Sequence, residues 1–266
     1  FYASPMFNPN NDASRWETAY KANKTALDYL TAQGKGLYKG NFADIWYDEQ
    51  NCEAIMVNQF YYPDHAFDQK NIRPEPLTRD GANDNQAILS LLMAFPKADG
   101  TKLELDVTRL SDPAYNQQFM TEFYTNRDPR FHATIFCPGT IYPCTNVQLE
   151  GGQKYWNAWY EQEVDGKTQM NSLVDFQTGT SIGGGMSGYF QKKGLDESLN
   201  NASVYQAETD WIEIRFAEVL MNYGECANEI GKTQEALNVL YQIRERAGIE
   251  NTTGNYGITA TTQSDI

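Results

Sequence analysis

Apolar residues recur every three or four positions along residues 211–248, which is the most regular pattern in this 266-residue chain. The first stripe is Ala217, Leu220, Gly224 and Ala227, and the second is Ala236, Leu240, Ile243 and Ala247. This spacing predicts two amphipathic helices. Gly231 is suited to end the first helix, Thr233 to cap the second and Gly248 to stop it. Because the connection is so short, we predict an antiparallel pair of tetratricopeptide type, which needs stacked neighbours to bury its apolar face.

Shorter patterns predict the remaining elements. Ser14 and Glu17 have capping-box spacing, which predicts a helix from there to Leu30. Its stripe includes Trp16 and Tyr20, and we expect it to pack on helical repeats outside this chain. A strand is predicted over 54–60, helices over 85–95 and 113–125, and strand-and-loop structure over 131–187.

These elements predict a mainly α fold with tetratricopeptide-like helical pairs, long irregular loops and a few short strands. No linker divides the chain, so we expect residues 1–266 to form a single domain portion. Its helix-rich parts are 1–35 and 208–249, and its loop- and strand-rich part is 50–200. Long irregular segments often carry function, which directs attention to 61–86 and 139–185.

The composition narrows the classes of function. A formal net charge of −14 disfavours direct binding to nucleic acid or to an anionic membrane surface. No apolar run is long enough to span a bilayer. Aromatic residues make up 13% of the chain although its mean hydropathy is −0.62, a combination that suits sugar or peptide binding and is also ordinary for a secreted protein.

The four cysteines leave alternatives open. Cys137 and Cys144 bracket a turn-prone loop, and a disulfide between them would stabilise the fold by about 2–3 kcal/mol. Cys52 and Cys226 are interpreted as small buried apolar residues. No Cys-x-x-Cys spacing occurs, so the sequence predicts no structural zinc site.

No set of residues assembles a catalytic site. The two histidines, His65 and His132, lie in different segments without ligand-like partners. The carboxylates at Glu161, Glu163 and Asp165 offer a glycosidase-like pair, but their closeness in a polar stretch is more typical of a solvated turn. The sequence therefore predicts no catalytic, metal or cofactor site.

Two clusters of aromatic and polar residues are suited to hold a ligand, because flat rings stack on sugars while amide and guanidinium groups reach hydroxyls. The predicted ligand-binding residues are Tyr61, Tyr62, Arg79, Asn83, Asn85, Trp156 and Trp159. The alternatives are exposed tyrosines at a strand end for the first cluster and core packing of both tryptophans for the second. The remaining tryptophans, Trp16, Trp46 and Trp211, lie at element starts and are interpreted as packing residues.

Five blocks in order along the chain carry a resemblance to a known family. They are residues 4–8 (Ser-Pro-Met-Phe-Asn), 53–56 (Glu-Ala-Ile-Met), 126–131 (Asn-Arg-Asp-Pro-Arg-Phe), 187–190 (Ser-Gly-Tyr-Phe) with Lys193, and 215–248, which contains Arg-Phe-Ala-Glu-Val-Leu and Ile-Arg-Glu-Arg-Ala-Gly. Together they resemble the SusD/RagB family of Bacteroidetes outer-membrane nutrient-binding lipoproteins. In that family the equivalent of the 61–86 loop helps to line the ligand groove.

The resemblance implies a cell-surface protein that binds glycan or peptide, without catalysis, and delivers it to a TonB-dependent transporter of the SusC type. It also implies attachment to the outer membrane through an N-terminal lipid anchor. The chain departs from the family pattern at its ends, since it opens at Phe1 without a signal region or a lipid-attachment cysteine. We therefore expect it to be the central and C-terminal portion of a longer protein.

Two other functions stay open on the sequence alone. A tetratricopeptide-type scaffold would bind a helix or tail of another protein, and a glycan-degrading enzyme would use the carboxylates named above. Within the resembled family, a peptide ligand is the alternative to a glycan. A lipidated cysteine upstream favours the nutrient-binding protein, further helical repeats favour the scaffold, and measurable hydrolysis favours the enzyme.

Overall fold

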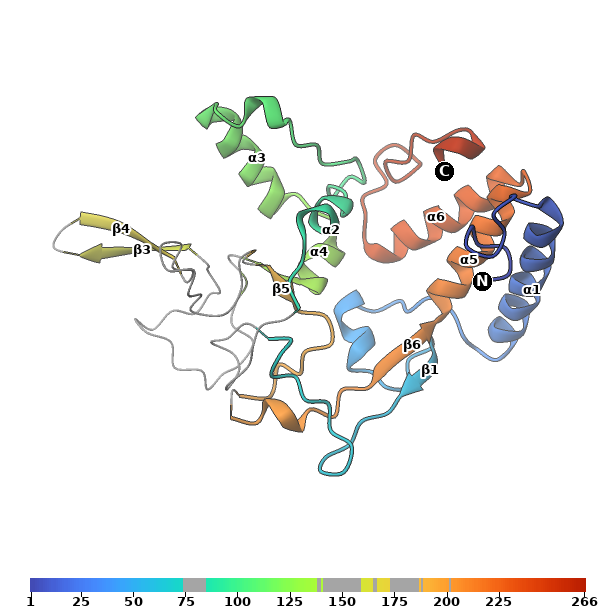
Figure 1. Ribbon diagram of the computed structural model, residues 1–266, viewed down its shortest axis with the longest axis horizontal. Helices are drawn as coiled ribbons and strands as arrows, with labels where there is room; N and C mark the ends of the chain where they lie inside the picture. Colours follow the sequence, from blue (N-terminus) through green and yellow to red (C-terminus); the bar gives the residue numbers. More distant parts are fainter. Residues whose placement is uncertain are drawn as a thin grey trace. The chain divides into compact units, whose positions relative to one another are not determined.

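The computed structural model describes residues 1–73, 85–137, 140, 159–164, 167–172, 187, 189–200 and 202–266 (Figure 1). Its α-helices are α1 (Ala13–Ala32), α2 (Leu89–Ala94), α3 (Pro113–Thr125), α4 (Pro129–Thr134), α5 (Phe216–Glu229) and α6 (Thr233–Ala247). Its strands are β1 (Ala54–Asn58), β2 (Ile135–Phe136), β3 (Trp159–Val164), β4 (Lys167–Ser172), β5 (Phe190–Gln191) and β6 (Trp211–Arg215). Within these residues the strands form the two-stranded pairs β1–β6, β2–β5 and β3–β4. The prediction of a mainly α fold with a few short strands is confirmed.

The chain divides into two compact units. One consists of Phe1–Val57, Pro96–Pro129 and Ile212–Ile266, and we call it the helical unit. The other consists of Asn58–Phe95 and Arg130–Trp211, and we call it the loop unit. The organisation of residues 1–266 as a single domain portion stays a prediction.

The predicted helix pair is present in the helical unit as α5 and α6, which lie side by side in Figure 1. Gly231 joins them with a φ of +79°, a left-handed conformation that favours glycine. The prediction was wrong for residues 211–215, which form strand β6 and not the start of a helix. The alternation of Ile212, Glu213 and Ile214 has the period of a strand, and pairing with β1 satisfies its backbone groups.

The contact between α5 and α6 depends on a small residue. A Cβ atom placed on Gly224 would lie 3.0 Å from Cγ1 of Val239, so any larger residue there would require the Val239 side chain to shift. Leu220 and Ile243 belong to the same buried cluster, as predicted. Leu240 was expected there but is only half-buried, because the close approach at Gly224 turns Val239 inward in its place.

The helix caps differ from the prediction by a residue or two. Asp12, not Ser14, caps α1, and its side chain accepts a hydrogen bond from the Ser14 amide at 2.9 Å. Thr233 is the first residue of α6, and Lys232 precedes it without a side-chain cap. Asp and Ser are both good caps, so the sequence alone does not decide between neighbouring candidates.

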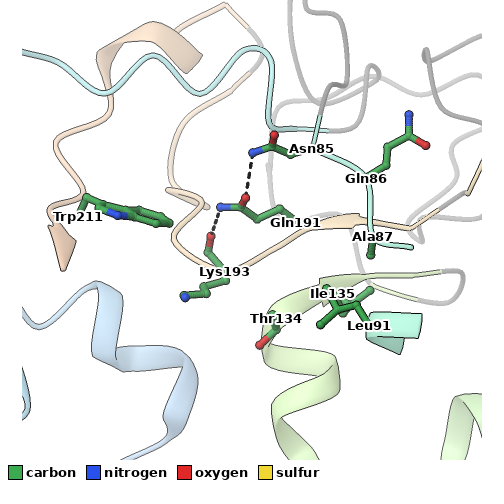
Figure 2. Close-up of a pocket in the computed structure, with 9 residues that line it drawn as sticks. All are labelled: Asn85, Gln86, Ala87, Leu91, Thr134, Ile135, Gln191, Lys193 and Trp211. Carbon is green, nitrogen blue, oxygen red and sulfur yellow. Dashed lines mark hydrogen bonds between the residues drawn. The ribbon is translucent and has the colours of Figure 1, made fainter. Parts of the chain in front are cut away.

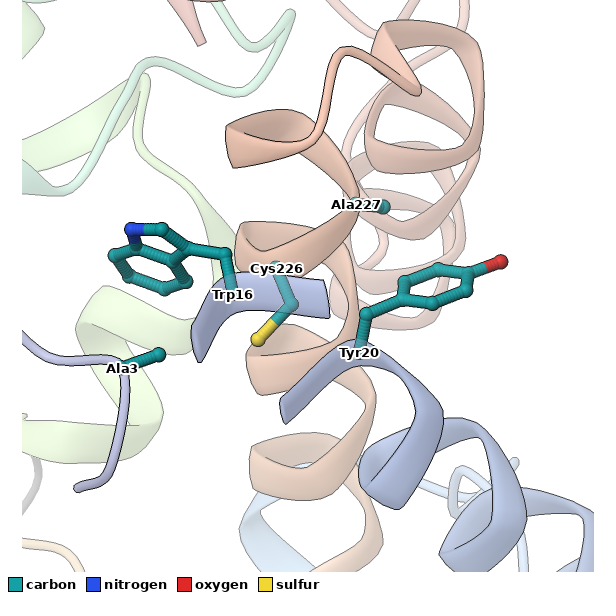
Figure 3. Packing of buried hydrophobic residues seen from close by; sticks show 5 residues of the cluster. All are labelled: Ala3, Trp16, Tyr20, Cys226 and Ala227. Atoms are coloured by element: carbon teal, nitrogen blue, oxygen red, sulfur yellow. The ribbon is translucent and has the colours of Figure 1, made fainter. Parts of the chain in front are cut away.

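Helix α1 packs on α5 within this chain, whereas Trp16 and Tyr20 were expected to pack on helical repeats outside it. Trp16 and Tyr20 of α1 lie in one buried cluster with Cys226 and Ala227 of α5, and Ala3 closes the cluster beside Trp16 (Figure 3). Three helices of the helical unit, α1, α5 and α6, therefore share a core. This arrangement supplies neighbours for the helix pair.

One buried carboxylate joins three of these elements. Glu53, just before β1, is fully buried, and its two oxygens accept from Arg215 Nη1 at 2.6 Å and Arg246 Nη1 at 2.7 Å. The Tyr38 amide donates to the same carboxylate at 2.9 Å. Blocks 53–56 and 215–248, which carry the family resemblance, thus meet at a single ion network that holds β1, β6 and α6 together.

The other predicted elements are confirmed in part. Helix α3 has the predicted bounds, and β1 ends two residues before the predicted end at Phe60. The helix expected over 85–95 is only α2, because residues 85–87 run extended beside β5. A short helix, α4, stands where strand and loop were expected, and it starts at Pro129, a residue that favours the first turn of a helix.

The cysteine interpretations have mixed outcomes. Cys226 is buried as expected, whereas Cys52 is only half-buried. Cys144 lies outside the described residues, so its disulfide with Cys137 stays a prediction. Across the described part of the chain, no helix combines the length and the apolar character that crossing a membrane requires.

Candidate ligand-binding site

A pocket of about 340 Å³ lies in the loop unit, and we call it the Trp211 pocket (Figure 2). Its lining residues are Asn85, Gln86, Ala87, Leu91, Thr134, Ile135, Gln191, Lys193 and Trp211. They come from the extended segment before α2, from α2 itself, from the end of α4, from strands β2 and β5, from the loop after β5 and from the start of β6. The volume is at the small end for small-molecule sites and fits one or two sugar rings.

Backbone pairing builds one wall of the Trp211 pocket. The Ala87 amide donates to the Tyr189 carbonyl at 2.9 Å, and the Gln191 amide donates to the Asn85 carbonyl at 3.3 Å. On its other side β5 pairs with β2, with Ile135 opposite Gln191. Segment 85–87, β5 and β2 thus lie next to one another, and this fixes the side chains that they carry.

A chain of amide hydrogen bonds crosses this wall. Asn85 Nδ2 donates to Gln191 Oε1 at 3.0 Å, and Gln191 Nε2 donates to the Lys193 carbonyl at 2.9 Å (Figure 2). An amide group has two donor hydrogens and an acceptor oxygen with two lone pairs. Each amide uses only part of this capacity in the relay, so the rest can serve hydroxyl groups of a ligand in fixed directions.

Trp211 and Lys193 form the opposite side of the pocket in Figure 2. The Trp211 side chain is half-buried and presents its indole ring, and Lys193 Nζ lies 5.6 Å from the centroid of that ring. A cation at this distance is attracted to the negative face of the indole. The pocket therefore combines an aromatic surface, several amides and one positive charge.

A buried polar pair holds the loop that carries Lys193. Gln69 and Arg73 are both almost fully buried. Gln69 Nε2 donates to the Gly194 carbonyl at 2.9 Å, and Arg73 donates to the carbonyls of Asp196 and Leu199 at 2.5 and 2.9 Å. Because these bonds lie in the interior of the loop unit, they are protected from competition with water. The loop after β5 is therefore fixed from its inner side.

A row of rings runs from the pocket to an exposed loop. Trp211 meets Phe67 edge to face at 6.2 Å, Phe67 stacks on Phe60 at 5.0 Å, and Phe60 stacks on His65 at 4.7 Å. Tyr61 lies against the edge of His65 at 6.2 Å. We call these five residues the aromatic row. It connects the Trp211 pocket to the tip of the segment that follows β1.

The tip itself is ordered by hydrogen bonds. Tyr61 and His65 exchange backbone bonds at 2.8 and 2.9 Å. The Phe60 amide donates to Asp210 at 2.8 Å, and the Tyr62 amide donates to Glu208 at 2.9 Å. Both tyrosine side chains are about half exposed, at 54% for Tyr61 and 47% for Tyr62. Their rings are held on a fixed backbone while they face solvent.

The predicted site residues fall into three groups. Tyr61 and Tyr62 are exposed on the tip, and Asn85 lines the Trp211 pocket. Trp159 is the first residue of β3, opposite Ser172, and its side chain lies outside the description. The other predicted site residues, Arg79, Asn83 and Trp156, lie outside the described residues. The binding role of all seven stays a prediction.

Sequence reasoning missed most of the Trp211 pocket. Trp211 was interpreted as a packing residue, and it does contact Phe67, but it also lines the pocket. Gln191 and Lys193 were not singled out as site residues. The available signal was a short polar run, Gln-Lys-Lys-Gly, directly after the Ser-Gly-Tyr-Phe block. That run has no period, so only the backbone pairing of β5 brings it beside Asn85.

The carboxylates proposed for a glycan-degrading enzyme were expected in a solvated turn, and two of them lie on a strand instead. Glu161 and Glu163 lie on strand β3, opposite Met170 and Thr168, so the prediction of a solvated turn was wrong for them. Flanking Trp, Tyr and Val residues favour a strand there. Asp165 lies outside the described residues. In the described part of the chain, no group of at least three His, Cys, Asp or Glu residues is arranged to hold a metal ion.

A larger pocket, of about 630 Å³, lies in the helical unit. It is lined by Thr31, Lys35, Gly36, Leu37, Tyr38, Lys39, Phe216, Gln242, Glu245 and Arg246. Arg246 is already paired with Glu53, and the Phe216 ring is buried in the helical core. We take the Trp211 pocket as the candidate site because it places the half-buried Trp211 ring in one pocket with the hydrogen-bonded amides of Asn85 and Gln191.

The fold defines a class of proteins with a tetratricopeptide-like helical scaffold and long loops, and the candidate site is a pocket in the loop unit. The sequence profile of the SusD family matches residues 44–266, and the chain belongs to that family. Among proteins of curated function, none matches the chain by sequence.

Several solved structures share this fold. A SusD-like protein from Bacteroides fragilis gives a TM-score of 0.63 at 22% identity, over 95% of this chain and 48% of its own length. A SusD-like carbohydrate binding protein from the same species gives a TM-score of 0.65 at 21% identity, over 94% of this chain and 44% of its own. A SusD superfamily protein from Parabacteroides distasonis gives 0.52 at 14% identity, over 99% and 43%. The chain thus spans about half the length of these structures.

Proposed function

We propose that the protein binds a glycan in the Trp211 pocket, without catalysis, and delivers it to a TonB-dependent transporter of the SusC type. The observation that carries this proposal is the pairing of the Trp211 ring with the amide relay of Asn85 and Gln191 in one pocket. Family membership and the fold shared with a SusD-like carbohydrate binding protein support the same proposal.

The chemistry of a sugar matches both parts of the pocket. One face of a pyranose is covered with C–H bonds, which pack on a flat aromatic ring, and its hydroxyls point outward around the ring. Amides pair with hydroxyls as donors and as acceptors. The relay that holds Asn85 and Gln191 lowers the entropy lost on binding, because these side chains are ordered before the ligand arrives.

A longer glycan would extend along the aromatic row to the exposed Tyr61 and Tyr62. We propose these tyrosines as secondary contacts, together with Asn85 in the pocket. The predicted contributions of Arg79, Asn83, Trp156 and Trp159 are retained as part of the proposal.

The test of binding is the variant Trp211→Ala, compared with Tyr205→Ala, which removes another exposed aromatic ring that does not line the pocket. We expect Trp211→Ala to weaken retention by the bound polysaccharide in affinity electrophoresis by about tenfold or more, equivalent to roughly 1.4 kcal/mol of lost contact. Tyr205→Ala should leave retention unchanged. Equal retention of both variants would place the glycan site elsewhere. Binding of peptides but of no polysaccharide would favour the peptide alternative.

The partner and the location are proposed on family grounds and need a separate test. Purification of the full-length protein from outer membranes should recover a large β-barrel transporter and a lipidated N-terminus. Recovery without a barrel and without a lipid anchor would contradict this part of the proposal. The binding result would still stand, because the two experiments measure different properties.

A further inference from the structure

Three short extended segments of the loop unit lie side by side along one wall of the Trp211 pocket. Gln86 pairs with Phe190 of β5, and Gln191 of β5 stands opposite Ile135 of β2, with both pairs antiparallel. In an antiparallel ladder, residues directly opposite each other carry their side chains on the same face, and successive residues alternate between faces. Asn85, Gln191 and Ile135 therefore form one row across a single face of this small sheet.

The row changes from polar to apolar along its length. The amides of Asn85 and Gln191 form its polar end, and the buried side chain of Ile135 forms its apolar end. Ala87 lies two residues after Asn85 and so on the same face, and Leu91 of α2 also lines the pocket (Figure 2). We call Ala87, Leu91 and Ile135 the apolar corner. The Trp211 pocket therefore sets an apolar corner next to the amide relay.

A hydroxyl group does not suit the apolar corner. Its three alkyl side chains provide no hydrogen-bond partner, and a polar group that leaves water without gaining one loses free energy. A methyl group gains free energy at the same place, because its apolar surface leaves water. A ligand that fills the corner is therefore expected to place a methyl group there.

The relay beside the corner can serve both a donor and an acceptor. Asn85 Nδ2 gives one hydrogen to Gln191 Oε1, and Gln191 Nε2 gives one to the Lys193 carbonyl. Each amide nitrogen carries a second hydrogen, and the Asn85 Oδ1 atom takes no part in the relay. An amide of the ligand can therefore accept a hydrogen bond from this pair and donate one to it.

An acetamido group joins these two properties. It is a methyl group bonded directly to an amide, which has a carbonyl acceptor and an N–H donor. The Cβ atoms of opposite residues such as Gln191 and Ile135 are about 4.5–5.5 Å apart, so one such group can contact both side chains. A 6-deoxy sugar supplies the methyl group alone, and an O-acetyl ester supplies the methyl group and the carbonyl without the N–H.

We infer that the Trp211 pocket selects glycans that contain N-acetylated amino sugars, with the acetamido methyl group in the apolar corner and the acetamido amide on Asn85 and Gln191. This inference rests on the proposed glycan-binding function and adds the chemical class of the ligand.

The experiment measures binding of the full-length protein to pairs of oligosaccharides by isothermal titration calorimetry. Chito-oligosaccharides are paired with cello-oligosaccharides of the same length, and glycosides of N-acetylgalactosamine with those of galactose. Each pair then differs only in having an acetamido group or a hydroxyl at C2. Two further arms pair 6-deoxyhexosides with the parent hexosides, and O-acetylated xylan fragments with their deacetylated forms.

The variant is Leu91→Asn, which replaces an alkyl side chain of the corner with a polar one of similar size. Leu91 is 46% exposed, so the change leaves the interior of the loop unit in place. The matched control is Leu89→Asn, the same change on the same helix at a residue that is 55% exposed and does not line the pocket.

We expect at least one acetamido sugar to bind about tenfold more tightly than its hydroxyl counterpart, from the burial of one methyl group and an added hydrogen bond. Leu91→Asn should reduce this ratio to about threefold or less, because the methyl contact is lost while the amide contacts stay. Leu89→Asn should preserve the ratio. The 6-deoxy and O-acetyl arms should show smaller ratios, since each lacks part of the acetamido group.

The failures of the inference and of the proposed function give different results. Equal affinity within every acetamido pair, or a preference that survives Leu91→Asn, overturns the inference and leaves glycan binding intact. Loss of the preference in both leucine variants, or an equal gain in the 6-deoxy or O-acetyl arm, also overturns it. Retention by polysaccharides without binding of any acetamido sugar has the same meaning. If neither these oligosaccharides nor any polysaccharide binds, the proposed function fails, and the inference with it.

Discussion

Polar side chains at the centre of the helical unit pair with one another, whereas polar side chains of the loop unit line the Trp211 pocket. In the helical unit, the carboxylate of Glu53 is fully buried and bonded to two arginines. In the loop unit, the amides of Asn85 and Gln191 form a relay that leaves part of their hydrogen-bonding capacity for a ligand. The first arrangement stabilises a fold, and the second is suited to bind.

The same contrast separates two tryptophans. Trp16 of the helical unit is 6% exposed, and its Nε1 donates to Asn11 Oδ1 at 2.6 Å, so both its ring and its polar atom are satisfied inside the protein. Trp211 is half-buried and offers its ring to a pocket. Glu53, Arg215 and Arg246 belong to the blocks that carry the family resemblance, and their ion pairs stabilise the helical unit.

The largest effect is expected from Glu53→Gln. This change leaves Arg215 and Arg246 near a neutral side chain in the interior, and breaking a buried ion pair costs about 3–5 kcal/mol. Urea unfolding followed by circular dichroism measures the loss of stability. Glu213→Gln is the control, since Glu213 is an exposed carboxylate on β6, and it should change the free energy of unfolding by about 0.5 kcal/mol or less. A cost below about 1 kcal/mol for Glu53→Gln would mean that the ion network does not stabilise the helical unit.

The second prediction compares the effects of removing each of the two tryptophan rings. Trp16→Ala should destabilise the protein by about 3–5 kcal/mol, the cost of removing a large buried ring. Glycan retention, measured at low temperature where the variant is still folded, should be unchanged. Trp211→Ala should cost about 1 kcal/mol of stability, since the side chain is only half-buried, while glycan retention falls. If both variants lost stability equally, the distinction between packing and binding tryptophans would be wrong.

The third prediction concerns the helix pair. Leu220→Ala should destabilise the protein by about 2–5 kcal/mol, because Leu220 is 6% exposed and packs in the cluster between α5 and α6. Met221→Ala, one residue along α5, removes a side chain of similar size that is 44% exposed, and it should cost much less. Thermal unfolding of the pair gives the comparison directly. Similar melting temperatures for the two variants would refute the assigned inward face of α5.

The sequence predicted the helical unit well because its signals are local. A stripe with a period of three to four residues identifies α5 and α6, and Gly231 ends the first of them as expected. The error at Leu240, in contrast, has a cause that lies in the contact between two helices. Several apolar residues lie near the helix interface, and the choice of Val239 depends on how closely Gly224 allows the helices to approach.

The loop unit was predicted less completely because its site depends on distant segments. Asn85 was singled out from its polar loop, but its partner Gln191 lies more than a hundred positions along the chain. The extended segments that bring them together are only two or three residues long, which is too short for a period to be recognised. Trp211 was interpreted as a packing residue because its position at the start of an element does not reveal, in the sequence, that a pocket lies beside it.

A smaller polar cluster in the helical unit leads to the last prediction. Tyr20 and Tyr223 stack at 5.1 Å, and both hydroxyls donate to Oε2 of Glu235. Lys232 Nζ lies 3.4 Å from the other oxygen of that carboxylate. The hydrogen bond from Tyr223, followed by that from Tyr20, lowers the pKa of Glu235 below its ordinary value of 4.5. Burial and the same carboxylate raise the pKa of Tyr223 above its ordinary value of 10.0.

The lowered pKa sets the direction of a pH effect on stability. Because the folded-state pKa of Glu235 is below the unfolded value near 4.5, its contribution is fully present above that pH and is lost as the pH falls through the folded-state pKa. Glu235 is 40% exposed, so solvent screening reduces the contribution to about 0.5 kcal/mol. Glu235→Gln should therefore destabilise the protein slightly at about pH 6, and the difference from the unmodified protein should shrink toward about pH 3.

The control is Glu245→Gln, which removes an exposed carboxylate from the same helix, and both variants are measured by urea titration across this pH range. A difference that stays constant from about pH 6 to pH 3 would mean that Glu235 contributes to stability through the shape of its side chain and not through its charge.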